Sequence, residues 1–152
     1  MTIDQFLTEN QDVILAQANA ALARAELRHY EDAGPQTTAV RLQTLYTLMI
    51  DALRERDLAA IVRYAEDLAA ARYAAGYDLL EVQTAFNALE EAIWQRLLED
   101  YPRDDLSMAL GLTSKVHGAG KDALARQYVR LAGGAPAARP DIDALFAGTD
   151  GV

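Results

Sequence analysis

Hydrophobic residues recur every three or four positions along most of this chain, which is the spacing of one face of an α-helix. The clearest run has apolar positions at Leu79, Val82, Phe86, Leu89, Ile93 and Leu97. Polar residues such as Glu81, Glu91 and Gln95 fall largely off that face. This run predicts an amphipathic helix about 35 Å long, at about 1.5 Å per residue, that can serve as a central packing partner.

The borders of this helix are marked on both sides. Gly76 suits the left-handed conformation that ends a preceding helix, because glycine has no Cβ to clash. Asp78 and Glu81 have the spacing of a capping box, in which two side chains satisfy free N–H groups at a helix start. Pro102 pushes the residue before it out of helical geometry. The sequence therefore predicts a helix that begins after Asp78 and ends before Pro102.

Similar patterns predict three helices before this one. The first starts after Thr2, with Gln5 at the capping-box position, and runs to about Tyr30. The second starts at Pro35 and is apolar over more than half of its circumference, which is typical of a central helix or of one that faces a second subunit. The third is capped by Asp57, or continues the second helix after a kink, and its many alanines allow close helix approach.

The last long helix is predicted from about Asp104 to Ala132. Glycines inside it each lower helix stability by about 1 kcal/mol relative to alanine. Near Gly118 and Gly120 this favours either a kink or close packing against a neighbouring helix. No segment shows the convincing alternation of a strand. Five long helices with short connections predict an all-α fold, either a five-helix bundle or a globin-like packing.

After the last helix the composition changes. Gly133, Gly134, Pro136 and Pro140 predict a flexible linker, which is followed by the short terminal peptide DIDALFAGTDGV. We therefore expect one helical domain over residues 1–132, and a linker with a short peptide over residues 133–152.

Charge and composition exclude several classes of protein. The chain has 152 residues and a net charge of -9, so most of its surface repels phosphate backbones and nucleic-acid binding is not expected. No run of eighteen apolar residues predicts a membrane span, and the acidic N-terminus does not resemble a signal peptide. The chain has no cysteine, which excludes thiolate chemistry and is compatible with a cytoplasmic protein.

Side chains able to carry out chemistry are few and poorly grouped. His29 lies near the predicted end of the first helix, where a solvated cation is tolerated, and His117 lacks the following residues of a phosphotransfer histidine. A di-iron bundle needs two Glu-x-x-His pairs, and only Glu26 with His29 has that spacing. The paired carboxylates Glu90-Glu91 and Glu99-Asp100 are interpreted as solvated faces. We expect no metal, no cofactor and no enzymatic activity.

A set of residues around the third and fourth predicted helices resembles the N-terminal sensor domain of RsbR-type proteins, the RsbT co-antagonists of bacterial stressosomes. The matching residues are Arg72, Gly76, Tyr77, Asp78, Leu80, Glu81, Val82, Ala85, Phe86, Leu89 and Trp94. The helix order and lengths extend this resemblance over roughly residues 1–132. The resemblance implies a globin-like fold without haem, a homodimer, and a role in stress sensing and signal transduction. Relatives carry an output domain after this one, so the chain is either a stand-alone member or part of a longer protein.

Two groups of residues are candidates for binding. If a small apolar ligand lies between the helices, as a globin-like fold allows, we expect Tyr46, Met49, Phe86 and Trp94 to line its site. Tyr77 and Tyr128 are further candidates, with Tyr46, for a pocket or a dimer face, although ordinary packing explains them as well.

The terminal segment DIDALFAG offers a second, weaker resemblance, to the EIDALL-type peptide of the flagellar switch protein, which docks onto a CheY-like receiver domain. Ile142, Leu145 and Phe146 would provide the apolar face of a short partner-binding helix. The alternatives are a frayed tail and a segment that packs on its own bundle.

Overall fold

The computed structural model describes residues 1–133 and 141–148, and within these ranges every regular element is a helix. This confirms the predicted all-α class. The elements, in chain order, are α1 (Ile3–Glu9), α2 (Gln11–Ala25), α3 (Arg28–Ala33), α4 (Pro35–Glu55), α5 (Ala59–Ala74), α6 (Leu79–Asp100), α7 (Leu106–Leu131) and the 3₁₀-helix η1 (Ile142–Gly148). Most of the predicted linker lies outside the described residues.

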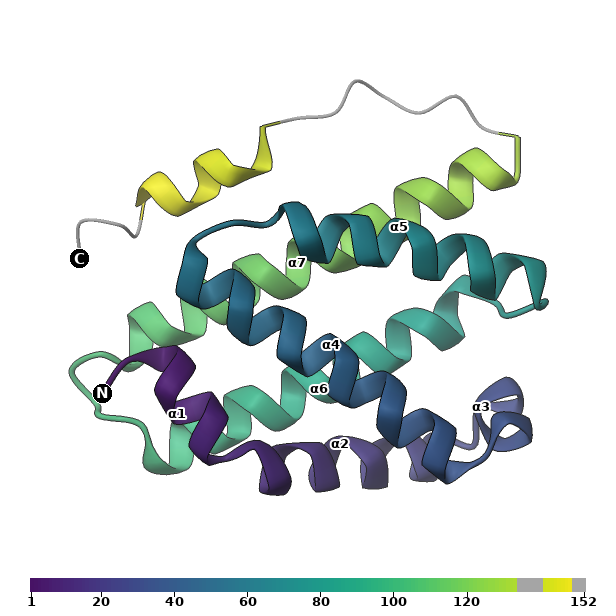
Figure 1. Ribbon diagram of the computed structural model, residues 1–152. Helices are drawn as coiled ribbons and strands as arrows, with labels where there is room; N and C mark the ends of the chain where they lie inside the picture. Colours follow the sequence, from purple (N-terminus) through teal and green to yellow (C-terminus); the bar gives the residue numbers. More distant parts are fainter. Residues whose placement is uncertain (134–140, 149–152) are drawn as a thin grey trace.

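The long helices α6 and α7 form an antiparallel pair joined by a short turn (Figure 1). Helix α5 packs along α7, and α2 packs along α6, while α4 crosses the front of the bundle and contacts both pairs. The terminal helix η1 lies against α7 on the side where α4 turns into α5. Helix α4 contacts α1, α2, α3, α5, α6 and α7, so it touches more of the other elements than α7, which contacts α4, α5, α6 and η1.

The first predicted helix is wrong as a single element, because the structure divides it into α1, α2 and α3. At Asn10 the side chain donates to the carbonyl of Phe6 (2.8 Å) and accepts from Nε of Arg96 (2.8 Å), so it ends one helix and anchors the next to α6. At Glu26 the backbone adopts a left-handed conformation with φ 53°, which ends α2 without a glycine.

Most other predicted helix borders are confirmed. Thr2 with Gln5 and Asp78 with Glu81 both form capping boxes, and Pro35 is the first residue of α4. The carboxylate of Asp57 accepts the N–H of Ala59 (2.9 Å), but the residue that caps α5 is Leu58, so the predicted cap Asp57 lies one position before the observed one.

Helix α7 is continuous through its glycines, so no break forms there. A Cβ built at Gly120 would come within 3.0 Å of Cε1 of Phe86, whereas one built at Gly118 would meet nothing within 4 Å. Close packing of α6 on α7 therefore explains Gly120, and it was one of the two alternatives left open by the sequence.

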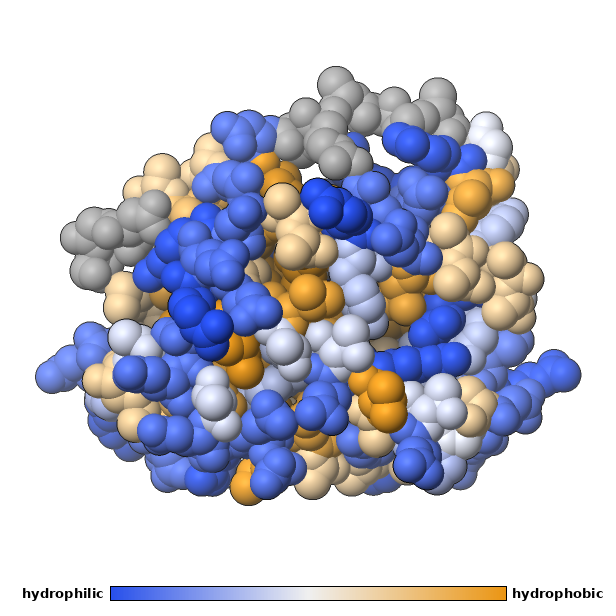
Figure 2. All heavy atoms as spheres, in the orientation of Figure 1, coloured by the Kyte–Doolittle hydropathy of each residue, from blue (hydrophilic) through white to orange (hydrophobic). Residues whose placement is uncertain are grey.

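The interior of the bundle is closely packed around the middle of α4, α6 and α7. Its largest fully buried side chains include Tyr46, Met49 and Phe86. The hydroxyl of Tyr46 donates to the carbonyl of Leu7 at 2.6 Å, so its polar end is satisfied inside the core. On the face that α4 crosses, hydrophobic side chains lie in scattered patches between hydrophilic ones (Figure 2). In the described residues, the helices are too short or too polar to cross a membrane.

Candidate functional site

The four residues proposed to line an apolar ligand fall in two different places. Tyr46, Met49 and Phe86 belong to the same core, where each is almost completely buried. Trp94 remains 39% exposed on the outer side of α6. A ligand between the helices could meet the first three residues, while Trp94 belongs to the surface. The ligand site stays a prediction.

The outer side of α6 carries a stripe of exposed apolar residues. Leu80, Trp94 and Leu98 recur at helical spacing and are all exposed. Beside them, alanines of α2 and α6 line a shallow groove of about 240 Å³, together with polar residues at its edges. Val13, in the first turn of α2, is also exposed. We call Leu80, Trp94, Leu98 and Val13 the α2–α6 face.

A polar cluster joins α3, α4, α5 and α6 around Tyr77. Nδ1 of His29 lies 2.7 Å from Oε1 of Glu81, and the backbone N–H of His29 donates to Oε2 of the same carboxylate at 3.2 Å. The ring of His29 also stacks on Tyr77, with the ring centroids 4.6 Å apart. His29 is therefore a partly buried residue near the start of α3 and not the solvated helix end that the sequence predicted.

Glu81 makes two sets of contacts in this cluster. Its carboxylate closes the capping box of α6 by accepting the N–H of Asp78 (3.3 Å), and it also holds His29. Burial raises the pKa of Glu81, but the hydrogen bonds from His29 and from the backbone outweigh this effect and lower the pKa overall. The sequence predicted the cap and missed the contact with His29, because no local pattern links residues so far apart.

Two arginines complete the cluster. Nη1 of Arg41 donates to the hydroxyl of Tyr77 at 3.0 Å, and that hydroxyl donates to the carbonyl of His29 at 3.3 Å. The guanidinium of Arg72 lies over the ring of Tyr77, 5.3 Å from its centroid. The Nε of Arg72 is buried and makes no hydrogen bond within the described residues. Tyr128 closes the cluster by donating to the carbonyl of Tyr77 at 3.1 Å.

His117 is completely buried on α7, where its ring nitrogens meet the backbone of Thr113 and Phe86 without a well-formed hydrogen bond within the described residues. Burial lowers its pKa to about 3, and the nearby charge of Lys121 acts in the same direction. A neutral, enclosed imidazole of this kind does not suit phosphotransfer, which needs an accessible nitrogen. Within residues 1–133 and 141–148, no three His, Asp or Glu side chains come together in a way that could hold a metal ion.

Of the paired carboxylates, Glu90 forms a partly buried ion pair with Nζ of Lys121 (2.9 Å), and Asp100 forms one with Nη2 of Arg96 (2.6 Å). Glu91 and Glu99 are exposed. These carboxylates therefore have ion-pair partners or face solvent, and they do not form a common site.

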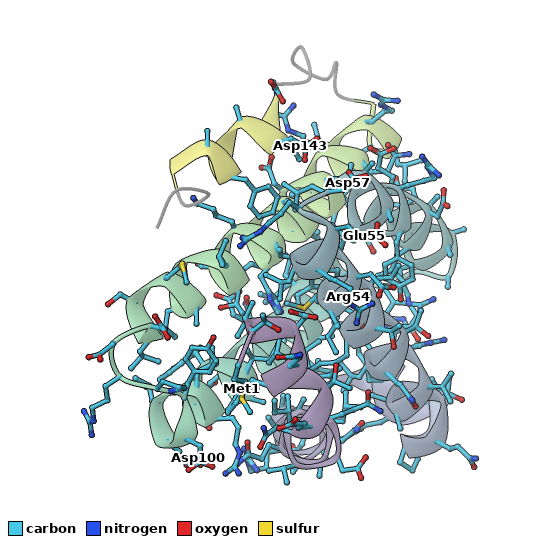
Figure 3. All side chains as sticks on the ribbon, turned by 60° about the vertical axis from the view of Figure 1, so that its left-hand side comes forward. Met1, Arg54, Glu55, Asp57, Asp100 and Asp143 are labelled. Carbon is cyan, nitrogen blue, oxygen red and sulfur yellow. The ribbon has the colours of Figure 1, made fainter. Side chains whose placement is uncertain are left out.

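The terminal peptide packs on its own bundle. Phe146 is only 2% exposed and lies under the guanidinium of Arg56, while Leu145 is 51% exposed. A carboxylate oxygen of Asp143 accepts the N–H of Leu58 at 3.2 Å, and Lys115 donates to the carbonyl of Leu145. Figure 3 shows Asp143 close to Asp57, which belongs to the α4–α5 turn. Of the three predicted partner-binding residues, Phe146 is thus covered, Leu145 is open, and Ile142 is partly buried.

These features define a helical bundle with an internal polar cluster, an exposed apolar face and a terminal segment folded back on it. A family model described as the RsbT co-antagonist protein rsbRD N-terminal domain matches residues 13–119. The chain belongs to this family, whose members are signalling sensor domains of the stressosome type and not a known class of enzyme. No curated protein and no solved structure matches the chain significantly.

Proposed function

We propose that this chain is a non-enzymatic bacterial sensor domain of the stress response that signals as a homodimer in the cytoplasm, with a protein as its output partner. The observation that supports this best is the α2–α6 face. A tryptophan that is 39% exposed and a leucine that is 48% exposed lie one helical turn apart on α6. Large apolar side chains grouped on one helix favour a protein contact over solvent.

A second copy of the chain is the partner that this face fits best. In a two-fold symmetric dimer the same helix meets its own copy, so a stripe along α6 is automatically matched by an identical stripe. The alanines of α2 and α6 beside the stripe leave a groove that a neighbouring helix can enter. Homodimerisation through α6 would also connect the polar cluster to the dimer interface. Tyr77 lies next to the start of α6, so a change of packing around Tyr77 can move that helix.

Disulfide cross-linking tests this arrangement, because the chain has no cysteine of its own. Glu91→Cys introduces a thiol on the exposed side of α6, and Asp67→Cys introduces one on the exposed side of α5 as a matched control. We expect mild oxidation to give a covalent dimer with Glu91→Cys at low micromolar protein and little with Asp67→Cys. Equal cross-linking of both variants would contradict a dimer through α6.

A small apolar ligand between the helices remains part of the proposal. The buried Tyr46, Met49 and Phe86 support it, because apolar binding sites in helical bundles lie between facing helices. A ligand there would have to displace side chains that are now packed together. Xenon binding followed by NMR would test it: chemical shift changes centred on Met49 would support the site, and none above background would remove it.

The alternative function is that of an adaptor that docks on a CheY-like receiver domain through the terminal peptide. Leu145 supports this, because it is an exposed apolar residue on a short helical segment. Phe146 could take part only after it leaves its own bundle. A pull-down with a receiver domain, in which Leu145→Ala or Phe146→Ala changes nothing, would contradict the adaptor function.

A further inference from the structure

A small cavity lies between α3, α4, α5 and α6, beside the cluster around Tyr77. Its volume is about 20 Å³, and its polar wall is made by Tyr30, Thr38, Arg41, Tyr64 and Arg72, while the remaining wall is apolar. A water molecule needs roughly 10–15 Å³ on this measure, so the cavity has room for a small polar group.

The cavity has two cationic side chains and no carboxylate on its wall. Within the described residues, neither Arg41 nor Arg72 forms an ion pair, although the chain as a whole carries a net charge of -9. Glu81, on the other side of Tyr77, is already engaged by His29 and by the cap of α6. Partly buried cations without an anion are costly, so their convergence at one cavity needs an explanation.

The arginines also have hydrogen-bond donors to spare. One nitrogen of Arg41 is used by Tyr77, and the buried Nε of Arg72 makes no hydrogen bond within the described part of the chain. A buried donor without a partner commonly marks the place of a water or an ion. The planar guanidinium of arginine offers pairs of donors that fit the two oxygens of a carboxylate.

The two tyrosines add neutral donors to the same cavity. Burial raises the pKa of Tyr30 to about 12, and the charges of Arg72 and Arg41, together with a hydrogen bond from Arg72, reverse this only in part. Burial raises the pKa of Tyr64 in the same way, again with Arg72 and Arg41 acting against it. Both phenols therefore keep their proton near neutral pH and can donate to an anion. The hydroxyl of Thr38 donates to the carbonyl of Gly34 at 3.1 Å, so it is already occupied.

We propose that this cavity is a binding site for the carboxylate group of a small anionic molecule, held by Arg41 and Arg72 and by the hydroxyls of Tyr30 and Tyr64. The site lies where α3, α4 and α5 meet the start of α6, so its occupation would stabilise that junction. The inference goes beyond the proposed function, and binding is measurable whether or not the chain dimerises.

Acetate is the probe for this site. The full chain is titrated with sodium acetate at constant ionic strength, with sodium chloride as the balancing salt, while the Nε–H resonance of Arg72 is followed by NMR. That resonance is identified as the signal lost in Arg72→Gln. We expect a saturable shift with half-saturation below about 10 mM, as a ligand of four heavy atoms allows, and a rise in melting temperature with acetate.

Three variants decide the outcome. Arg72→Gln should abolish the effect of acetate on the melting temperature. Tyr64→Phe, which keeps the packing of the ring, should weaken binding about fivefold or more. Arg63→Gln removes an exposed positive charge from the same helix and should leave binding unchanged. If Arg72→Gln does not fold, Tyr64→Phe alone is compared with Arg63→Gln.

Two results would overturn the proposal. A linear, non-saturating response to acetate, the same in wild type and in the foldable variants, would show that the cavity holds no specific anion. An equal response to chloride and to acetate would show that the arginines attract any anion and do not select a carboxylate.

Discussion

The carboxylate of Glu81 lies 2.7 Å from Nδ1 of His29, which precedes it by 52 positions in the chain. Through this contact α3 is fixed against the first turn of α6. The ring of Tyr77 stacks on His29, and its hydroxyl accepts a hydrogen bond from Arg41. The join between α5 and α6 is thus also the place where side chains of the five helices α3 to α7 come together.

Replacement of Glu81 by glutamine should lower the free energy of unfolding by about 1–3 kcal/mol at pH 7, because a partly buried charged hydrogen bond is lost. The pKa of Glu81 is lowered in the folded protein, so its contribution is present above the ordinary value of 4.5 and disappears as pH falls through the folded pKa. Urea unfolding at several pH values from 7 down to 3 measures this. Glu91→Gln on the same helix is the control, and an equal loss in both variants would contradict the role of Glu81.

His117 should make the protein sensitive to mild acid. Its folded pKa of about 3 is far below the 6.5 of a free histidine, so the unfolded chain takes up the proton first. The stability contributed by the neutral ring is present above pH 6.5 and is lost toward pH 3, by about 1.4 kcal/mol per pH unit. His117→Leu should flatten this dependence between pH 7.5 and 5 in urea titrations. An unchanged slope would show that other groups cause the loss.

The two central glycines of α7 should respond differently to alanine. Gly118→Ala places a methyl group in open space and should raise the free energy of unfolding by up to about 1 kcal/mol through helix propensity. Gly120→Ala should gain less, and Gly120→Val should lose about 1–3 kcal/mol, because the added atoms meet the ring of Phe86. Thermal unfolding compares the three variants. Equal gains at both positions would mean that α6 and α7 do not pack closely there.

Phe146→Ala should release the terminal peptide from the bundle. Phe146 is buried, whereas its neighbour Leu145 is largely exposed and provides the matched control. The N–H of Leu58 donates a hydrogen bond to Asp143. We expect this N–H to exchange with deuterium at least about tenfold faster in Phe146→Ala than in Leu145→Ala. Identical exchange in both variants would show that the aromatic ring does not hold the peptide.

The sequence predicted those parts of the fold that depend on neighbouring residues. The capping boxes at Thr2 and at Asp78, and the start of α4 at Pro35, follow from local hydrogen bonding and were predicted correctly. The break at Glu26 was missed, because a non-glycine residue takes the left-handed conformation there without a turn motif. Tertiary contacts of the first three helices override the continuous apolar pattern.

The candidate site was harder to predict, because it also depends on tertiary contacts between residues far apart in the chain. Arg41 and Arg72 are separated by most of two helices, so their convergence on Tyr77 depends on how α4 and α5 pack. Residue type and helix face were enough to find the buried Tyr46, Met49 and Phe86. They were not enough for Trp94, because an aromatic residue on the border of the apolar face suits either a core or an interface.

The mass of the full chain in solution tests the homodimer most directly. Light scattering coupled to gel filtration, at protein concentrations up to high micromolar, should give about twice the chain mass of 16.6 kDa. The double variant Trp94→Ala with Leu98→Ala should give the mass of one chain, with unchanged helical circular dichroism. A wild-type mass of one chain throughout this range would contradict a signalling homodimer built on the α2–α6 face.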